Sequence, residues 1–329
     1  MTTYHRSWQV IGHEWAVEHL SRAIQHNRMR HAYLLTGPTQ IGKTTLARAF
    51  AMALNCTGEQ VPCGGQCRAC KLIGKDSHLD VSIIESESGT LKIEQVRELQ
   101  QILALRPYEA RYRVAILRRF HEALPAAANA LLKTLEEPPP GVVLILTASS
   151  ADLLLPTIVS RCQPLHLRPL PVDTIRDALI NQWGAPPDLA QTLAQLSGGR
   201  IGWAIRAYED SAELEQRTAA LDILEKALLG TRRERFALVE HLSLEKPAVL
   251  ALLDVWQGYW RDVLLLAAGS QVPITNDDSA ESLRDLAQGI GLDGAHRALE
   301  ATRRTIISLG KNVNVRLAME VLMLDYPKP

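Results

Sequence analysis

The sequence has no excess of charge of either sign, because 36 lysine and arginine residues face 36 aspartate and glutamate residues. Such a chain has no general electrostatic attraction to nucleic acid, so any contact with DNA must come from a local patch or from partner subunits. The sequence also lacks a signal peptide and any run of eighteen apolar residues, which argues against secretion and against a membrane span. We therefore expect a cytoplasmic protein.

Cysteine is scarce outside one short segment. Four of the five cysteines are Cys56, Cys63, Cys67 and Cys70, and Cys162 lies far from them. Without a signal peptide, this clustering favours a metal site over disulfides, and four thiolates suit a closed, structural Zn²⁺ site. An iron–sulfur cluster and four buried or redox-active thiols are the alternatives. We expect Cys162 to pack as a small apolar side chain.

The length of 329 residues predicts two or three domains. Up to about residue 167, short apolar runs alternate with helical patterns, which predicts a parallel sheet covered by helices on both faces. The expected strands are 33–36, 81–84, 114–117, 142–146 and 164–167, and the expected helices are 43–54, 93–105 and 125–137. After Pro169 we find helical patterns alone: a small unit to about Tyr208, then amphipathic stretches at 214–229, 248–268 and 295–309.

One segment fits the phosphate-loop pattern G-x-x-x-x-G-K-[ST] between an expected strand and an expected helix: Gly37-Pro38-Thr39-Gln40-Ile41-Gly42-Lys43-Thr44. The two glycines let the backbone turn its N–H groups toward phosphates. Lys43 would place its ammonium group on the β- and γ-phosphates, and Thr44 would coordinate Mg²⁺. Together with Thr45, this segment is the candidate site for ATP and Mg²⁺. The motif predicts nucleotide binding and does not by itself predict hydrolysis.

A phosphate loop whose helix leads into a four-cysteine segment resembles the subunits of the bacterial DNA polymerase III clamp loader, which are AAA+ proteins. Four further segments carry the likeness: Ile11–His13, His31–Leu35, Asn129–Pro139 (NALLKTLEEPP) and Leu155–Gln163, which contains a Ser-Arg-Cys motif. The resemblance covers about residues 8–205. It implies a nucleotide-binding core (1–167) with a zinc module (56–70), a helical lid (168–208) and a helical collar for oligomerisation (209–329).

The resemblance also implies roles and partners. Arg161 would be an arginine finger that reaches in trans to the nucleotide of a neighbouring subunit, where a guanidinium stabilises charge on the transferring phosphoryl group. The partners would be gamma/tau and delta subunits in a hetero-pentamer, with the sliding clamp and primer–template DNA reached through the complex. Asn129–Glu137 is expected to be a helix on the sheet, and both a structural and a functional role for it stay open.

The sequence departs from the pattern of the family's ATPases at the acidic residues. Those ATPases carry an Asp-Glu pair directly after a four-residue apolar strand, where the Asp holds Mg²⁺ and the Glu orients water. Here the strand is followed by Arg118 and Arg119, which repel Mg²⁺. Glu122 would replace the acids only if the chain were irregular.

A second departure lies in the expected lid. The position where the family's motor subunits place an arginine on the γ-phosphate falls on Gly202 or Trp203, with Arg200 and Arg206 as the candidate substitutes. The loss of the acids together with the retention of Arg161 resembles the delta-prime subunits, the stationary members that keep Ser-Arg-Cys and often lose hydrolysis. We therefore predict a weak or inactive ATPase that donates Arg161 to a neighbour. The alternatives are a gamma/tau-type ATPase motor that uses Glu122 and an interaction subunit that binds no nucleotide.

Overall fold

The computed structural model describes residues 7–85, 90–310 and 313–328, so residues 1–6 of the expected core lie outside the described part. The chain forms two compact units. The first holds the chain up to Thr174 together with Arg200–Gly202, and the second holds Ile175–Gly199 and Trp203–Pro329. The expected domain limits at residues 167 and 208 stay a prediction.

The first unit is built on a five-stranded parallel sheet in the order β2-β3-β4-β1-β5. Its strands are β1 (Ala32–Thr36), β2 (Val81–Ile84), β3 (Arg113–Leu117), β4 (Val142–Ala148) and β5 (Gln163–His166). Every residue of β1, β3 and β4 is buried, as expected for central strands of a parallel sheet with both faces covered. All five predicted strands are confirmed to within two residues at each end.

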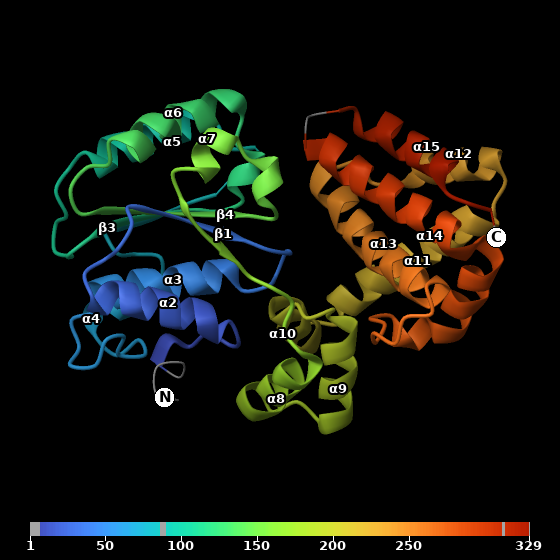
Figure 1. Ribbon diagram of the computed structural model, residues 1–329, viewed down its shortest axis with the longest axis horizontal. Helices are drawn as coiled ribbons and strands as arrows, with labels where there is room; N and C mark the ends of the chain where they lie inside the picture. Colours follow the sequence, from blue (N-terminus) through green and yellow to red (C-terminus); the bar gives the residue numbers. More distant parts are fainter. Residues whose placement is uncertain (1–6, 86–89, 311–312, 329) are drawn as a thin grey trace. The chain divides into compact units, whose positions relative to one another are not determined.

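Helices cover both faces of this sheet (Figure 1). On one face lie α2 (Glu14–Gln25), α3 (Lys43–Asn55) and α4 (Arg68–Gly74), and on the other lie α5 (Ile93–Leu103), α6 (Pro125–Glu136) and α7 (Pro156–Val159). Side chains of one strand alternate between the two cores: Tyr33 of β1 packs with Phe50 of α3, whereas Leu34 joins Leu131 of α6. Short 3₁₀ helices follow β3 and β4: η1 (Phe120–Glu122) and η2 (Ala151–Leu153). The parallel α/β core predicted from the alternating pattern is confirmed.

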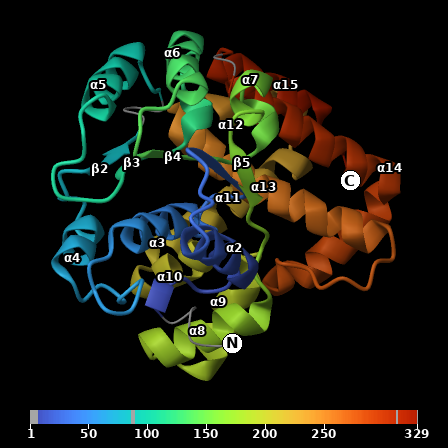
Figure 2. The same cartoon turned by 60° about the vertical axis from the view of Figure 1, so that its left-hand side comes forward.

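The remainder of the described chain is helical (Figure 2), which confirms the expected change of pattern. Its helices are α8 (Val172–Trp183), α9 (Pro187–Leu196), α10 (Ile201–Glu209), α11 (Ala212–Leu229), α12 (Arg232–His241), α13 (Lys246–Ala267), α14 (Ala280–Gly310) and α15 (Val315–Asp325), with a 3₁₀ turn η3 (Asp277–Ser279) before α14. Trp256 and Trp260 of α13 are fully buried beside Tyr326. Helix α14 is longer than the expected 295–309 stretch and is interrupted at Gly291, whose φ is 63°. No helix among the described residues has the length and apolarity that crossing a bilayer requires.

Candidate functional site

The phosphate loop joins β1 to α3 at the carboxyl edge of the sheet. Gly37 has a φ of 143° and Gly42 a φ of 103°, so both adopt backbone that favours glycine. A Cβ on Gly37 would also lie 2.5 Å from the carbonyl oxygen of Leu167. Helix α3 begins at Lys43, so its first N–H groups face the loop, as an anion site requires. The Lys43 ammonium donates to the carbonyl oxygens of Gly37 and Pro38, each at 2.6 Å.

Two contacts from distant segments hold the middle of the loop. The Nε2 atom of His13 lies 2.9 Å from the carbonyl oxygen of Ile41, and because that oxygen can only accept, Nε2 carries the proton. Burial lowers the pKa of His13, although this hydrogen bond opposes the shift, so the ring is neutral near pH 7. The N–H of Gly202, in α10, donates to the carbonyl oxygen of Gln40 at 2.8 Å. A Cβ on Gly202 would approach that oxygen to 2.8 Å, so this lid position excludes a side chain.

Two arginines directly follow the carboxyl end of β3, and nearby carboxylates neutralise their charges. Arg118 Nη1 lies 2.6 Å from Glu85 Oε2, and Arg119 Nη2 lies 3.4 Å from Glu85 Oε1. Arg119 Nε also lies 3.3 Å from Oε2 of Glu122, which ends η1. The Arg119 backbone has a left-handed φ of 48°, and its N–H donates to Thr147 Oγ1 on β4. The carboxylates of Glu85 and Glu122 therefore already face guanidinium groups.

Arg161 lies just after α7, with a side chain that is 35% exposed. Its Nη2 atom pairs with Glu136 Oε1 at 2.8 Å, and its Nη1 atom donates to the carbonyl oxygen of Thr157 at 3.0 Å. Its neighbour Cys162 is buried, as expected, and burial raises the pKa of that thiol to about 12.

The four clustered cysteines converge around the start of α4. Their sulfur atoms all lie within 4.8 Å of one another, and Cys56 Sγ is 4.0 Å from Cys67 Sγ. A tetrahedral Zn²⁺ with Zn–S bonds of about 2.3 Å would space its ligands by about 3.8 Å, so the spacing fits. Among the backbone N–H groups that donate to these sulfur atoms are those of Gly58, Cys67 and Cys70, over 3.2–3.5 Å. The four thiols could therefore hold one metal ion.

The environment moves the thiol pKa values in opposite directions. Burial would raise the pKa of Cys67, but hydrogen bonds from the N–H groups of Cys70 and Thr57 bring it down to about 5. Burial raises the pKa of Cys56 and, together with the neighbouring sulfur atoms, that of Cys70. A divalent cation is the group that would allow all four sulfur atoms to ionise together, so the donor set fits a tetrathiolate metal site.

Comparisons with known proteins identify a family for this chain. The family profile described as "DNA polymerase III, delta subunit" matches residues 12–171, and the one described as "DNA polymerase III, delta subunit, C terminal" matches residues 211–327. Together they cover well over half of the chain. The delta′ subunit of Bacillus subtilis DNA polymerase III is 28% identical over 93% of this chain and 93% of its own length. The chain belongs to the DNA polymerase III clamp-loader family.

Other members of the clamp-loader family match a smaller part. The tau/gamma subunit of Haemophilus influenzae is 39% identical over 163 residues, which are 49% of this chain and 23% of that protein. The chain thus spans less than half of the length of such tau and gamma relatives. Among solved structures, a gamma-subunit-related protein from Thermotoga maritima matches 93% of this chain at 16% identity with a TM-score of 0.41. The RuvB branch migration motor of the same organism matches 62% at 17% identity with a TM-score of 0.42.

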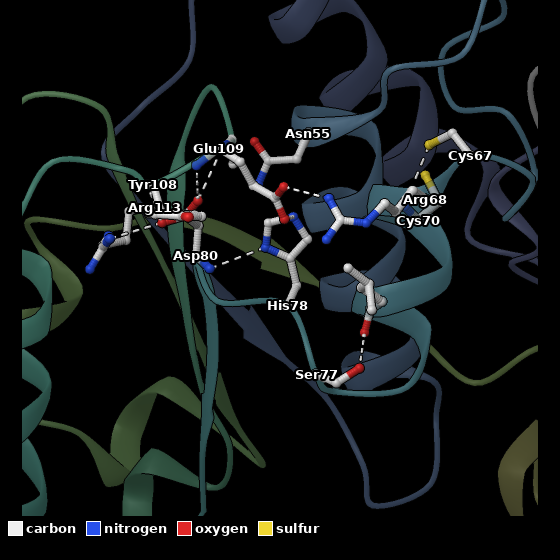
Figure 3. A network of polar contacts seen from close by, with 12 residues as sticks. Asn55, Cys67, Arg68, Cys70, Ser77, His78, Asp80, Tyr108, Glu109 and Arg113 are labelled. Carbon is white, nitrogen blue, oxygen red and sulfur yellow. Dashed lines mark hydrogen bonds and ion pairs between the residues drawn. The ribbon is translucent and has the colours of Figure 1, made fainter.

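In this clamp-loader chain a polar network ties the cysteine segment to the sheet (Figure 3). Arg68 of α4 pairs with Glu109 at 2.7 Å, and the Glu109 N–H donates to the buried carboxylate of Asp80 at 2.9 Å. Asp80 also pairs at 2.8 Å with Arg113, the first residue of β3. A path of contacts thus runs from the cysteine segment to β3, the strand that Arg118 directly follows.

Sequence reasoning missed the contacts that three residues make at the site. Glu85 balances the arginines after β3, and its position directly after a predicted strand was the available signal. His13 lies in a segment that carried the family likeness, but the sequence assigned it no contact. Gly202 was recognised as a departure from the family, although its contact with the phosphate loop was not. Arg200 and Arg206 stay the candidate substitutes for the lid arginine, and Arg206 pairs with Glu213 at 3.1 Å.

Proposed function

We propose that this chain is a delta-prime-type subunit of the DNA polymerase III clamp loader. It acts in DNA replication by helping to load the sliding clamp, and it donates Arg161 in trans to a neighbour's nucleotide. Its own site binds nucleotide at Gly37–Thr45 but hydrolyses ATP weakly or not at all. The observation that carries this proposal is the pair Arg118 and Arg119 at the carboxyl end of β3, beside an otherwise complete phosphate loop.

Electrostatics at this edge of the sheet argue against catalysis in cis. The two guanidinium groups and the carboxylates of Glu85 and Glu122 balance in charge and are paired with each other. A Mg²⁺ ion would need a carboxylate ligand, and those of Glu85 and Glu122 are each already engaged by an arginine. A gamma/tau-type motor would require Glu122, whose carboxylate lies 3.3 Å from the Arg119 guanidinium, to release that partner. The arrangement favours a stationary subunit.

The C-terminal helices are proposed to assemble this chain with the other clamp-loader subunits. Helix α15 buries Ala318, Met319, Leu322 and Met323 on one side. Its opposite side exposes Leu317, Val321 and Leu324, with exposed fractions of 56%, 49% and 48%. A helix with two apolar faces needs two partners, and the second face is free among the described residues. We assign it to contact with gamma/tau and delta subunits in a hetero-pentamer, which in turn reaches the sliding clamp and primer–template DNA.

The cysteine segment is proposed to hold one structural Zn²⁺ through Cys56, Cys63, Cys67 and Cys70. Bound Zn²⁺ would supply the positive charge that four thiolates require. The chain's own residues fix the ligands: Cys67 caps α4 by accepting from the Cys70 N–H, and Arg68 anchors α4 to Glu109. The site therefore serves stability and placement, since four protein ligands leave no open position for substrate.

Reconstitution tests the proposal. The purified chain is mixed with gamma/tau and delta subunits, and complex formation and ATP turnover are measured with and without this chain. We expect a complex that hydrolyses ATP and loads the clamp only when this chain is present, and little turnover by the chain alone. Substantial turnover by the isolated chain would instead assign it to the gamma/tau type. Failure to join the other subunits would remove the clamp-loader role.

A further inference from the structure

An ion pair joins two of the segments that carry the family likeness. Glu136 is the last residue of α6, in Asn129–Pro139, and Arg161 belongs to the Ser-Arg-Cys motif. Their atoms Oε1 and Nη2 lie 2.8 Å apart. The role that the sequence left open for Asn129–Glu137 is therefore tied to the arginine.

The contacts of Arg161 fix the plane of its guanidinium group but do not use all of its N–H donors. Nη1 donates to the carbonyl oxygen of Thr157 at 3.0 Å and to Ser160 Oγ at 3.3 Å, and Nη2 pairs with Glu136. A guanidinium has five N–H groups, so these three contacts leave Nε–H and one Nη2–H without a partner among the described residues. Nε and Nη2 are neighbouring nitrogens of the guanidinium group, so these donors can reach phosphate oxygens beside the pair with Glu136.

Helix α6 holds the Glu136 carboxylate in place. Leu131 and Leu135 of this helix are buried against the sheet. The Gln100 side chain of α5 donates to the carbonyl oxygen of Ala130 at 2.8 Å and to Thr134 Oγ1 at 2.9 Å, which ties the two helices together. Glu136 thus projects from a rigid support.

The position of Glu136 is not explained by helix stability. A carboxylate in the last turn meets the negative end of the helix dipole, so this site disfavours glutamate. The pair with Arg161 is also half-exposed, and exposed ion pairs contribute little to folding. What the pair does achieve is to restrict a long, flexible arginine side chain to one orientation.

We propose that Glu136 is a positioning residue for Arg161. It holds the guanidinium in the orientation from which Nε and Nη2 meet the phosphate oxygens of a neighbour's nucleotide, so that less freedom is lost when the subunits close on ATP. This inference rests on the proposed function, because it requires that Arg161 act in trans.

The test uses the reconstituted complex with four versions of this chain: wild type, Glu136→Gln, Arg161→Ala and the double variant. Glu137→Gln is the matched control, because Glu137 is the next residue, is exposed and has no ion pair among the described residues. Clamp-stimulated ATP turnover is measured as kcat and KM, and size-exclusion chromatography checks assembly. The difference between wild type and Arg161→Ala defines the turnover that depends on Arg161.

We expect Glu136→Gln to reduce the Arg161-dependent turnover about tenfold through kcat, with KM unchanged, and to have no further effect in the Arg161→Ala background. Glu137→Gln should behave as wild type. Equal activity of Glu136→Gln and wild type, a gain of activity, or the same loss with and without Arg161 would each overturn the positioning role while leaving the proposed function intact. If Arg161→Ala itself has no effect, the proposed function fails first.

Discussion

The buried carboxylate of Asp80 should be the most sensitive point in the connection between the cysteine segment and the sheet. Asp80 is fully buried and accepts backbone N–H groups of Tyr108, Glu109 and Ala110 at 2.8, 2.9 and 3.0 Å. It also neutralises Arg113, whose side chain is 7% exposed. Asp80→Ala would leave a buried guanidinium without its counter-charge. Breaking a buried pair in this way costs about 3–5 kcal/mol.

A surface pair nearby provides the control. Asp76 pairs with Arg48 at 2.6 Å, but the two side chains are 43% and 32% exposed. Asp76→Ala should therefore cost about 1 kcal/mol or less through the lost pair, and about 1 kcal/mol more because alanine disfavours the left-handed φ of 53° at this position. The two variants compare a buried and an exposed aspartate on the same segment of chain.

Hydrogen exchange on the full chain measures the free-energy cost of each substitution in individual segments of the protein. Peptides that cover β3 should exchange about 10²- to 10⁴-fold faster in Asp80→Ala than in wild type, since 1.4 kcal/mol corresponds to a factor of ten. Peptides from α13 serve as an internal reference and should not change. Equal rates in Asp80→Ala and Asp76→Ala would refute the claim that burial makes the Asp80 pair decisive.

Three further outcomes follow from the same contacts. Hydrogen bonds outweigh burial and lower the pKa of Asp80 below 3.8, so the stability difference between wild type and Asp80→Ala should hold near neutral pH and shrink only below about pH 4 in acid titrations of unfolding. Metal analysis should find about one Zn per chain, and Cys67→Ser should lose it and lower the thermal midpoint; a metal-free wild type with unchanged stability would contradict the site. Val321→Glu, on the exposed face of α15, should weaken entry into the complex at least tenfold, whereas Leu189→Glu on α9 should not; equal binding of both would remove α15 from the interface.

The sequence sufficed for features whose signal is local. Each strand is an apolar run closed by turn residues, and the phosphate loop follows a fixed spacing, so both could be located to within a residue or two. The end of α6 could be predicted from the sequence because Pro138 cannot continue a helix. The arginines after β3 could be placed because they directly follow a recognisable strand.

Features made by pairs of distant residues could not be predicted. Nothing local links Glu136 to Arg161 or Asp80 to Arg113, since each pair depends on how separate elements pack. The break at Gly291 also escaped notice, because a glycine inside a helical pattern is often tolerated and only the positive φ marks the interruption. Long-range contacts of this kind require the fold before they can be recognised.

The central claim is that this subunit hydrolyses little or no ATP at its own nucleotide site and contributes to hydrolysis at the site of a neighbouring subunit. The most direct measurement compares Lys43→Ala and Arg161→Ala in the reconstituted complex by clamp-stimulated ATP hydrolysis and clamp loading. An arginine finger contributes on the order of 10³-fold or more at one site, although turnover at the other sites makes the loss in the whole complex smaller. We predict a clear loss for Arg161→Ala and little change for Lys43→Ala. The reverse order, with Lys43→Ala crippling turnover and Arg161→Ala without effect, would show that the chain is a motor that uses Glu122.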